Sequence, residues 1–457
     1  MEEYKILSPT GIVGYGFPEE SFRTGVSMKP DLIACDAGSS DPGPYYLGSG
    51  IPFTNATAVK RDMTLMLKAA CELNVPLIIG TAGGSGAAPH MGREISIIKE
   101  IAEEHKLSFK LAAISAELEK GFLLEELRKG NIKSLDNVPE LTGQDIMEST
   151  HIVAQMGIEP IIKALDEGAQ IILCGRCYDP AAFAAPAIHK GYNKALSIHL
   201  GKLLECAAIA ATPGSGSDCM IGYLGEDYFR VEPLNPTRRC TPLSVSAHTL
   251  YEKSDPILLP GPGGTLDLSE CGFIAETDRC VKVTGSRYIK AERYMVKLEG
   301  ARQVGYRTVS ICGNRDPIFI SQIDNILDGL KKRVKDNLSG SNFDYELDFI
   351  VYGKNGVMGA LEPLNTIASH EIGIVIDAVA DTQEHAGAVC SVARSTLLHY
   401  GYEGRIATAG NLAFPFSPSD IEVGAVYTFS VYHLLECEQP EALFARTHYE
   451  IKEGAVQ

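Results

Sequence analysis

Two acidic residues stand in a Gly- and Pro-rich loop that carries no basic residue, a pattern suited to proton transfer. Asp36 ends an apolar run over 31–36, and Asp41 follows five residues later. Carboxylates without a neighbouring cation can act as a general base or bind a divalent metal ion. Asp and Ser also stabilise turns through backbone hydrogen bonds, so this loop alone leaves the structural alternative open.

A second loop consists of small residues and leads into a helical pattern. Small residues let backbone N–H groups converge on an anion at the start of a helix. The loop matches neither the dinucleotide fingerprint nor the P-loop, so a phosphate, a pyrophosphate or a carboxylate would each fit. A tight packing turn is the alternative. The candidate binding residues are Thr81, Gly83, Gly84, Ser85 and Gly86.

Ser85 supports a different hypothesis, because small residues flank it as in a nucleophile elbow between a strand and a helix. A serine hydrolase or acyl transferase would need a histidine and an acid brought close to Ser85 by the fold. His248 is available for this role. It precedes a predicted short helix and would titrate near neutrality beside an acid pair.

Arg176 and Asp179 follow another apolar run, over 170–174. The guanidinium fork of arginine suits a substrate carboxylate. Asp179 is a candidate acid, although its place before Pro180 is equally typical of a helix N-cap. Cys174 and Cys177 form a lone CxxC pair without further metal ligands nearby, so we expect neither a zinc site nor redox chemistry.

These loops follow the strands of a predicted α/β domain with a mostly parallel, doubly wound sheet. In such a sheet ligands bind beyond the carboxyl ends of the strands, so the loops should meet at one edge. Strand patterns are found at 31–36, 75–80, 109–115 and 170–174, and helical patterns at 63–70, 97–102, 123–127 and 150–167.

The 457 residues exceed what one core usually holds, about 300 residues, so we expect two domains. The first covers 1–300 and includes a β-rich segment over 215–300. The second covers 301–457, where strand and helix patterns alternate as in a split β-α-β sandwich.

The composition excludes several classes of protein. Lys and Arg total 41 against 58 Asp and Glu, a net charge of −17, which disfavours nucleic-acid partners. The acidic N-terminus does not resemble a signal peptide, and no apolar run is long enough to cross a membrane. The 12 cysteines are scattered along a long chain, which favours reduced thiols and a cytoplasmic location.

Several segments of the chain carry a family resemblance: 6–17, 35–48, 81–86, Gly175-Arg176 with Asp179, 247–251, Gly285-Ser286 and 411–420. These segments span most of the chain, and together they resemble the acyclic terpene utilisation AtuA family. The resemblance implies a catabolic enzyme of carboxylic acids or acyl-CoA compounds. The family loop around Arg176 usually lacks cysteines, so the CxxC pair looks incidental. Some relatives carry an additional small C-terminal domain, which a separate small subunit could supply here.

We therefore expect a carbon–oxygen lyase of the hydratase or dehydratase type, acting on a small anionic carboxylic acid or CoA thioester. Asp36, Asp41, Asp179 and His248 would move protons, and Arg176 would hold the anion. A divalent cation on Asp36 and Asp41 would stabilise an enolate. The alternatives are an acyl hydrolase using Ser85 and a non-catalytic ligand-binding subunit. A homo-oligomer is the default expectation.

Overall fold

The computed structural model describes residues 2–251 and 254–457, which form two compact units. The first unit contains the chain up to Arg302 together with 429–457, and the second contains 303–428. The predicted boundary lies near residue 300, but the predicted second domain also includes 429–457, which belong to the first unit. Two long strands, β15 (Met295–Asn314) and β18 (Asp420–Glu436), contribute residues to both units.

Five parallel strands form the centre of the first unit, as predicted. They are short and consist of almost continuously buried residues, because both faces of the sheet are covered. In spatial order they are β1 (Tyr4–Ser8), β2 (Leu32–Cys35), β3 (Leu77–Ile79), β7 (Ile171–Cys174) and β4 (Phe109–Ile114).

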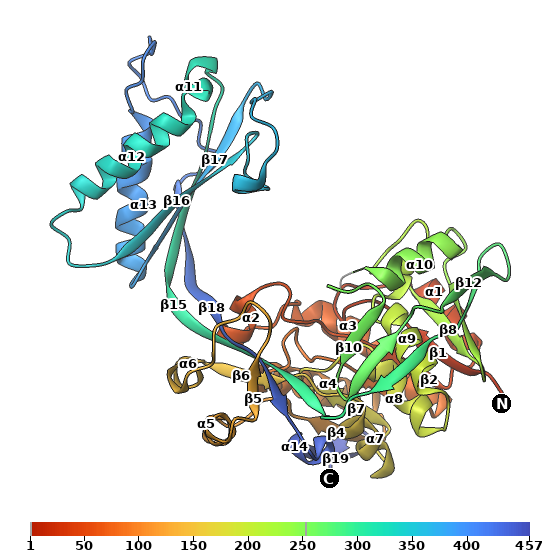
Figure 1. The fold of residues 1–457 in the computed structure, drawn as a ribbon. Coiled ribbons are helices and arrows are strands. Elements are labelled where there is room, and N and C mark those ends of the chain that lie inside the picture. Colours follow the sequence, from red (N-terminus) through yellow and green to blue (C-terminus); the bar gives the residue numbers. More distant parts are fainter. Residues whose placement is uncertain (1, 252–253) are drawn as a thin grey trace. The chain divides into compact units, whose positions relative to one another are not determined.

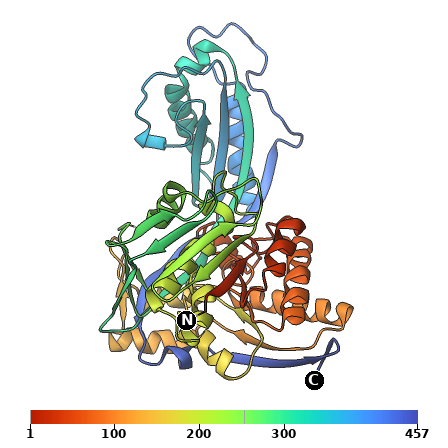
Figure 2. The same ribbon diagram turned by 90° about the vertical axis from the view of Figure 1, so that its right-hand side faces the viewer.

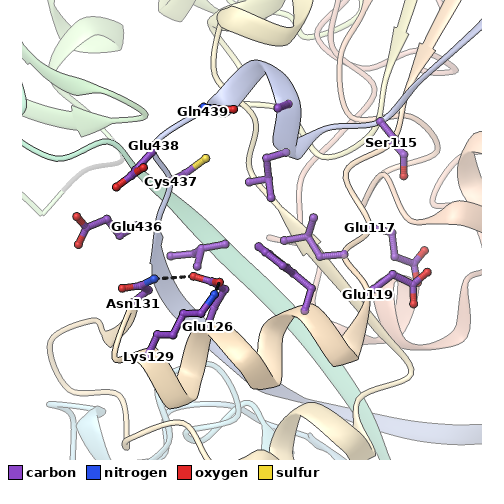
Figure 3. A pocket seen from close by; sticks show the side chains of 16 residues that line it. Ser115, Glu117, Glu119, Glu126, Lys129, Asn131, Glu436, Cys437, Glu438 and Gln439 are labelled. Carbon is purple, nitrogen blue, oxygen red and sulfur yellow. Dashed lines mark hydrogen bonds and ion pairs between the residues drawn. The ribbon is translucent and has the colours of Figure 1, made fainter.

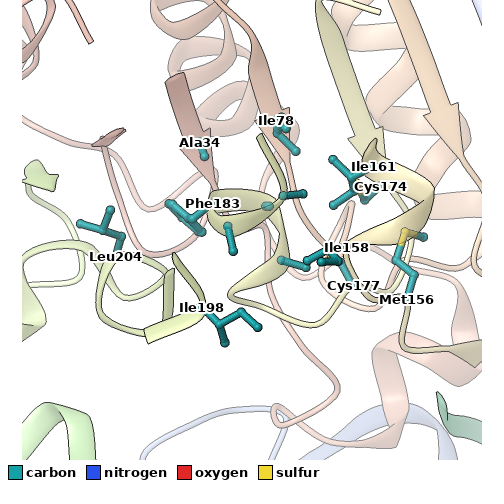
Figure 4. Close-up of a cluster of buried hydrophobic side chains, with 14 of the residues drawn as sticks. Ala34, Ile78, Met156, Ile158, Ile161, Cys174, Cys177, Phe183, Ile198 and Leu204 are labelled. Carbon is teal, nitrogen blue, oxygen red and sulfur yellow. The ribbon is translucent and has the colours of Figure 1, made fainter. Parts of the chain in front are cut away.

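Helices cover the two faces of this sheet in two separate apolar layers. One face packs against α1 (Glu19–Ser27), α3 (Ala56–Leu73) and α4 (Ala88–His105), and the other against α7 (Glu159–Asp166), α8 (Ala181–His189) and α9 (Lys194–Leu204). Phe183 of α8, for example, lies close to Ala34 and Ile78 of the sheet (Figure 4). The doubly wound architecture is thus confirmed. Within the described residues, no helix is long and apolar enough to span a membrane.

Antiparallel strands extend the sheet on both sides to a total of 11 strands among the described residues. Beyond β1 lie β8 (Met220–Leu224), β9 (Tyr228–Pro233), β13 (Val281–Thr284) and β12 (Gly272–Ala275), and beyond β4 lie β19 (Arg446–Lys452) and β20 (Ala455–Val456). A small sheet contains β10 (Leu258–Gly261), β11 (Gly264–Asp267) and β14 (Arg287–Lys290). The predicted β-rich segment is therefore present. Its helix α10 (Pro242–Leu250) includes His248, which does not precede the helix as predicted.

The prediction of a helix over 150–167 is wrong for the first half of that range. The structure has a strand, β6 (His151–Ala154), followed by α7. The β-branched pair Ile152 and Val153 fits a pleated, buried surface better than a helix. β6 pairs antiparallel with β15, so that Glu299 lies opposite Val153 and Ala301 opposite His151.

The second unit has the predicted split β-α-β arrangement. Its strands lie in the order β16 (Tyr345–Tyr352), β17 (Ile372–Ala380), β15 and β18, and β17 pairs antiparallel with both β16 and β15. The helices α12 (Ile323–Asn337) and α13 (Gln383–Leu398) lie together on one side of these strands (Figures 1 and 2). The remaining elements are α2 (Pro44–Ser49), α5 (Lys120–Lys129), β5 (Ile132–Ser134), α6 (Gly143–Glu148), α11 (Pro317–Ser321) and α14 (Pro440–Leu443).

Candidate active site

The loops that follow β2, β3 and β7 meet at the carboxyl edge of the parallel sheet, and glycines make this possible. A Cβ atom on Gly38 would lie 2.7 Å from the Cα of Gly84, and one on Gly86 would overlap the backbone N of Arg176. All three glycines also have positive φ angles, which side chains tolerate poorly. The three loops are therefore in direct backbone contact.

The amides of the 81–86 loop are largely satisfied within the protein. The N–H groups of Ala82, Gly84 and Gly86 donate to the carbonyls of Cys174, Thr81 and Ala82. At the start of α4, the N–H of Ala87 donates to the His90 ring and that of Ala88 to a Glu117 carboxylate. These contacts favour the packing alternative over an anion cradle.

Arg176 anchors a buried network of charges at this edge. Its guanidinium is only 3% exposed, with Nη1 2.9 Å from Asp179 Oδ1 and Nε 2.7 Å from Glu299 Oε2. Nη1 also donates to the carbonyl of Cys177. Arg176 therefore holds two carboxylates of the protein itself, whereas the sequence suggested that it would hold a substrate carboxylate.

Asp36 and Asp179 form an acid pair beside Arg176. Burial, followed by the nearby charge of Asp179, raises the pKa of Asp36 well above its usual range, despite the opposing effect of Arg176. Among the described residues, Asp36 Oδ1 has no hydrogen-bond partner. The Asp179 side chain is 24% exposed, so this member of the pair can meet a ligand. Asp36 therefore retains its proton at a pH where an exposed aspartate would have lost it.

Lys297 and Glu299 complete the network, and sequence reasoning missed both. Glu299 is fully buried, and Lys297 Nζ lies 2.6 Å from its Oε1. Burial acts to raise the pKa of Glu299, but the charges of Arg176 and Lys297 lower it to about 2. Lys297 is 22% exposed, so it is the more accessible cation of the network. The available signal was their i, i+2 spacing, which places both charges on one face of β15.

The other predicted residues of these loops do not take the roles that the sequence suggested. Asp41 is exposed, and its backbone N–H donates to Ser39 Oγ. Thr81 is buried, and its hydroxyl accepts the N–H of Cys177, so it supports the Arg176 loop. Ser85 is also buried, and its hydroxyl has no hydrogen-bond partner among the described residues, which lends no support to a catalytic serine. No group of three or more His, Cys, Asp or Glu in the described chain could hold a metal ion.

His248 lies in α10, where its ring stacks on Tyr251 with 4.7 Å between the ring centroids. Burial, with a smaller effect of Lys202, lowers the pKa of His248 to about 4. The sequence suggested a histidine that titrates near neutrality beside an acid pair. Its buried surroundings keep the imidazole neutral at pH 7, which is more typical of a structural residue.

The buried state of His248 predicts acid sensitivity. Its pKa falls from 6.5 in the unfolded chain to about 4 in the folded one, so the unfolded chain binds more protons between these values. Stability should therefore fall as the pH falls from 6.5 to 4, with a contribution from His248 of up to about 3 kcal/mol. Urea unfolding of the wild type and of His248→Gln at several pH values measures this. A difference between the two proteins that does not change over this range would contradict it.

A cavity of about 830 Å³ lies elsewhere in the first unit, between α5 and the C-terminal segment that includes α14. Glu117 and Glu119 lie on one side of it and Glu436 and Glu438 on the other (Figure 3). Its remaining walls include apolar side chains such as Phe122. Its lining includes none of the acid pair and network residues described above.

A family model matches part of the chain. Residues 56–218 match the family model described as the acyclic terpene utilisation family protein AtuA. No curated protein and no solved structure matches the chain. The matched segment includes the 81–86 loop, Arg176 and Asp179, and the family description supports a catabolic role in terpene utilisation. Over residues 56–218, the chain is therefore similar to the AtuA family.

Proposed function

We propose that the protein is a lyase of the hydratase or dehydratase type that acts on a small carboxylic acid or its CoA thioester. The observation that carries this proposal is the acid pair Asp36–Asp179 beside Arg176, which holds Asp179 and is linked through Glu299 to Lys297. Elimination of water from an anionic substrate requires a proton donor and a cation, and here Asp36, whose pKa is raised well above its usual range, lies in the same site as the accessible Lys297.

The reaction places separate demands on these groups. In the dehydration direction, the C–H bond next to the carbonyl breaks, a C=C bond forms and the C–O bond at the neighbouring carbon breaks. The departing hydroxide takes a proton and leaves as water. The acid pair supplies that proton, and Asp179 is its accessible member. Lys297 faces the carboxylate or thioester oxygen, where negative charge develops in the transition state.

Replacement of Lys297 by Met should weaken binding of the anionic substrate by about 10- to 100-fold, because one charge-assisted hydrogen bond is lost. A thermal-shift panel of 3-hydroxy acids, 2-enoic acids, dicarboxylates and their CoA thioesters measures this. A compound at about 100 times its Kd stabilises the wild type by about 2.7 kcal/mol. Each variant is compared with its own ligand-free melting temperature.

Lys282→Met is the matched control, since Lys282 also lies over a tyrosine ring but outside the site. This control should keep the full ligand-induced shift. An equal shift in Lys297→Met and in the wild type would contradict the assigned role of Lys297. A panel in which the wild type binds no carboxylate and no thioester would contradict the proposed substrate class.

A further inference from the structure

We infer that His151, oriented by Glu117, is a second acid–base group of the same site. This inference rests on the proposed function and extends it, because it assigns the base that the acid pair does not supply. Neither residue carries a signal in the sequence, since His151 lies in a segment predicted as helix and Glu117 in an unassigned loop.

Glu117 and His151 form a fixed dyad. His151 Nδ1 lies 2.7 Å from Glu117 Oε1, and the N–H of Ala88, at the start of the 18-residue helix α4, donates to Glu117 Oε2 at 2.6 Å. Burial acts to raise the pKa of Glu117, but the contacts with His151 and the Ala88 N–H lower it. Glu117 is therefore a carboxylate. A carboxylate can only accept a hydrogen bond, so Nδ1 of His151 donates to it, and Nε2 is the ring nitrogen left to exchange a proton with a substrate.

The dyad is accessible to solvent, whereas Arg176 and Glu299 of the charge network are buried. The His151 and Glu117 side chains are 22% and 24% exposed, close to the values of Lys297 and Asp179. The neighbouring His90 is fully buried, and burial lowers its pKa to about 4, so it places no positive charge beside the dyad at pH 7.

Strand pairing places the dyad and the charge network on one face. Val153 of β6 lies opposite Glu299 on one side and forms a bridge with Glu117 on the other. Paired residues point to the same face of a sheet, and so do residues two apart along a strand. One face of these strands therefore carries the dyad, Glu299 and Lys297. It is the face on which Glu299 contacts Arg176.

His151 and Lys297 lie at separate positions along the face that they share. His151 lies opposite Ala301, which is four residues along β15 from Lys297, or about 13 Å between backbone positions. The two side chains extend over part of this distance. An acyl substrate that is held by its carboxylate or thioester oxygen at Lys297 and extends toward His151 would place the neighbouring carbon between the two groups.

This arrangement completes the elimination. Nε2 of His151 takes the proton from the carbon next to the carbonyl, and the electron pair of that C–H bond forms the C=C bond. The hydroxide on the neighbouring carbon leaves with the proton of the acid pair, which yields the unsaturated acid or thioester and water. The imidazolium then returns its proton to solvent and the acid pair regains one, so the enzyme is restored.

Hydrogen exchange separates the two proton positions. The probes are 3-hydroxybutyrate and 3-hydroxybutyryl-CoA in D2O, with deuterium at C2 and formation of the unsaturated product followed by mass spectrometry. His151→Gln should lower both rates by about 100-fold or more, because the base is lost. Glu117→Gln should lower them by about 10-fold through loss of ring orientation, whereas Asp36→Asn should keep C2 exchange and lose dehydration.

His189→Gln is the matched control, because His189 also pairs with a carboxylate, that of Asp166, outside the site. Both this control and His151→Gln should keep the probe-induced thermal shift, which shows that the site is folded. Exchange in His151→Gln equal to that of the wild type would overturn the inference and leave the proposed function standing. A wild type that neither exchanges nor dehydrates either probe would overturn both.

Discussion

Replacement of Arg176 by Met is expected to lower the free energy of unfolding by about 3–5 kcal/mol. Arg176 lies in the interior between Asp179 and Glu299, and Glu299 is fully buried. Without the guanidinium, Glu299 keeps only Lys297 as a cationic partner, and breaking a buried ion pair from one side leaves an uncompensated charge. Urea unfolding at pH 7, monitored for the first unit, measures the loss.

An exposed pair provides the control for this measurement. Arg23 pairs with Glu19 along the surface of α1, with an arginine side chain that is 78% exposed. Exposed pairs contribute about 0–1 kcal/mol, so Arg23→Met should be nearly neutral. The double replacement of Arg176 and Glu299 by Met removes both charges. It should therefore lower the free energy of unfolding by less than the sum of the two single replacements. A loss below about 1 kcal/mol for Arg176→Met would show that the network is not a buried electrostatic anchor.

Asp36→Asn is expected to lower turnover by about 100- to 10,000-fold, which is the usual contribution of a positioned acid. Asn has the shape of a protonated carboxyl group but does not donate an acidic proton. Because burial and Asp179 already favour the neutral form of Asp36, the substitution should change stability little. Steady-state formation of the unsaturated product, together with the thermal shift produced by the ligand, separates lost chemistry from lost binding.

Asp41→Asn is the matched control, since both acids were candidates in the same loop and Asp41 is exposed. It should keep turnover within a factor of about two, as surface substitutions usually do. Equal losses in both variants would point to the loop as a whole and not to the acid pair. Full turnover in Asp36→Asn would remove Asp36 from the mechanism.

The centre of the fold could be predicted because its signals are local. Short apolar runs alternate with helical patterns, and a sheet built this way brings Asp36, Arg176 and Asp179 to one edge. The outer strands could not be placed in the same way. β19 pairs with β4 from more than 300 residues away, and no short-range pattern specifies that pairing.

The rest of the candidate site was missed for two physical reasons. Glu299 meets Arg176 across 123 residues, so only the fold reveals that the two charges neutralise each other. His151 was hidden because the apolar residues of β6 and α7 were combined into one helical pattern. Burial also changed the roles expected of individual residues, since His248 and Ser85 are enclosed by the protein.

The measurement that tests the central claim most directly is the dehydration assay of 3-hydroxybutyrate and 3-hydroxybutyryl-CoA with the wild type, Asp36→Asn and Asp41→Asn in parallel. The account predicts formation of the unsaturated product by the wild type and Asp41→Asn, and a rate at least about 100-fold lower for Asp36→Asn. Equal rates for all three proteins, or no product from the wild type with either compound, would contradict it.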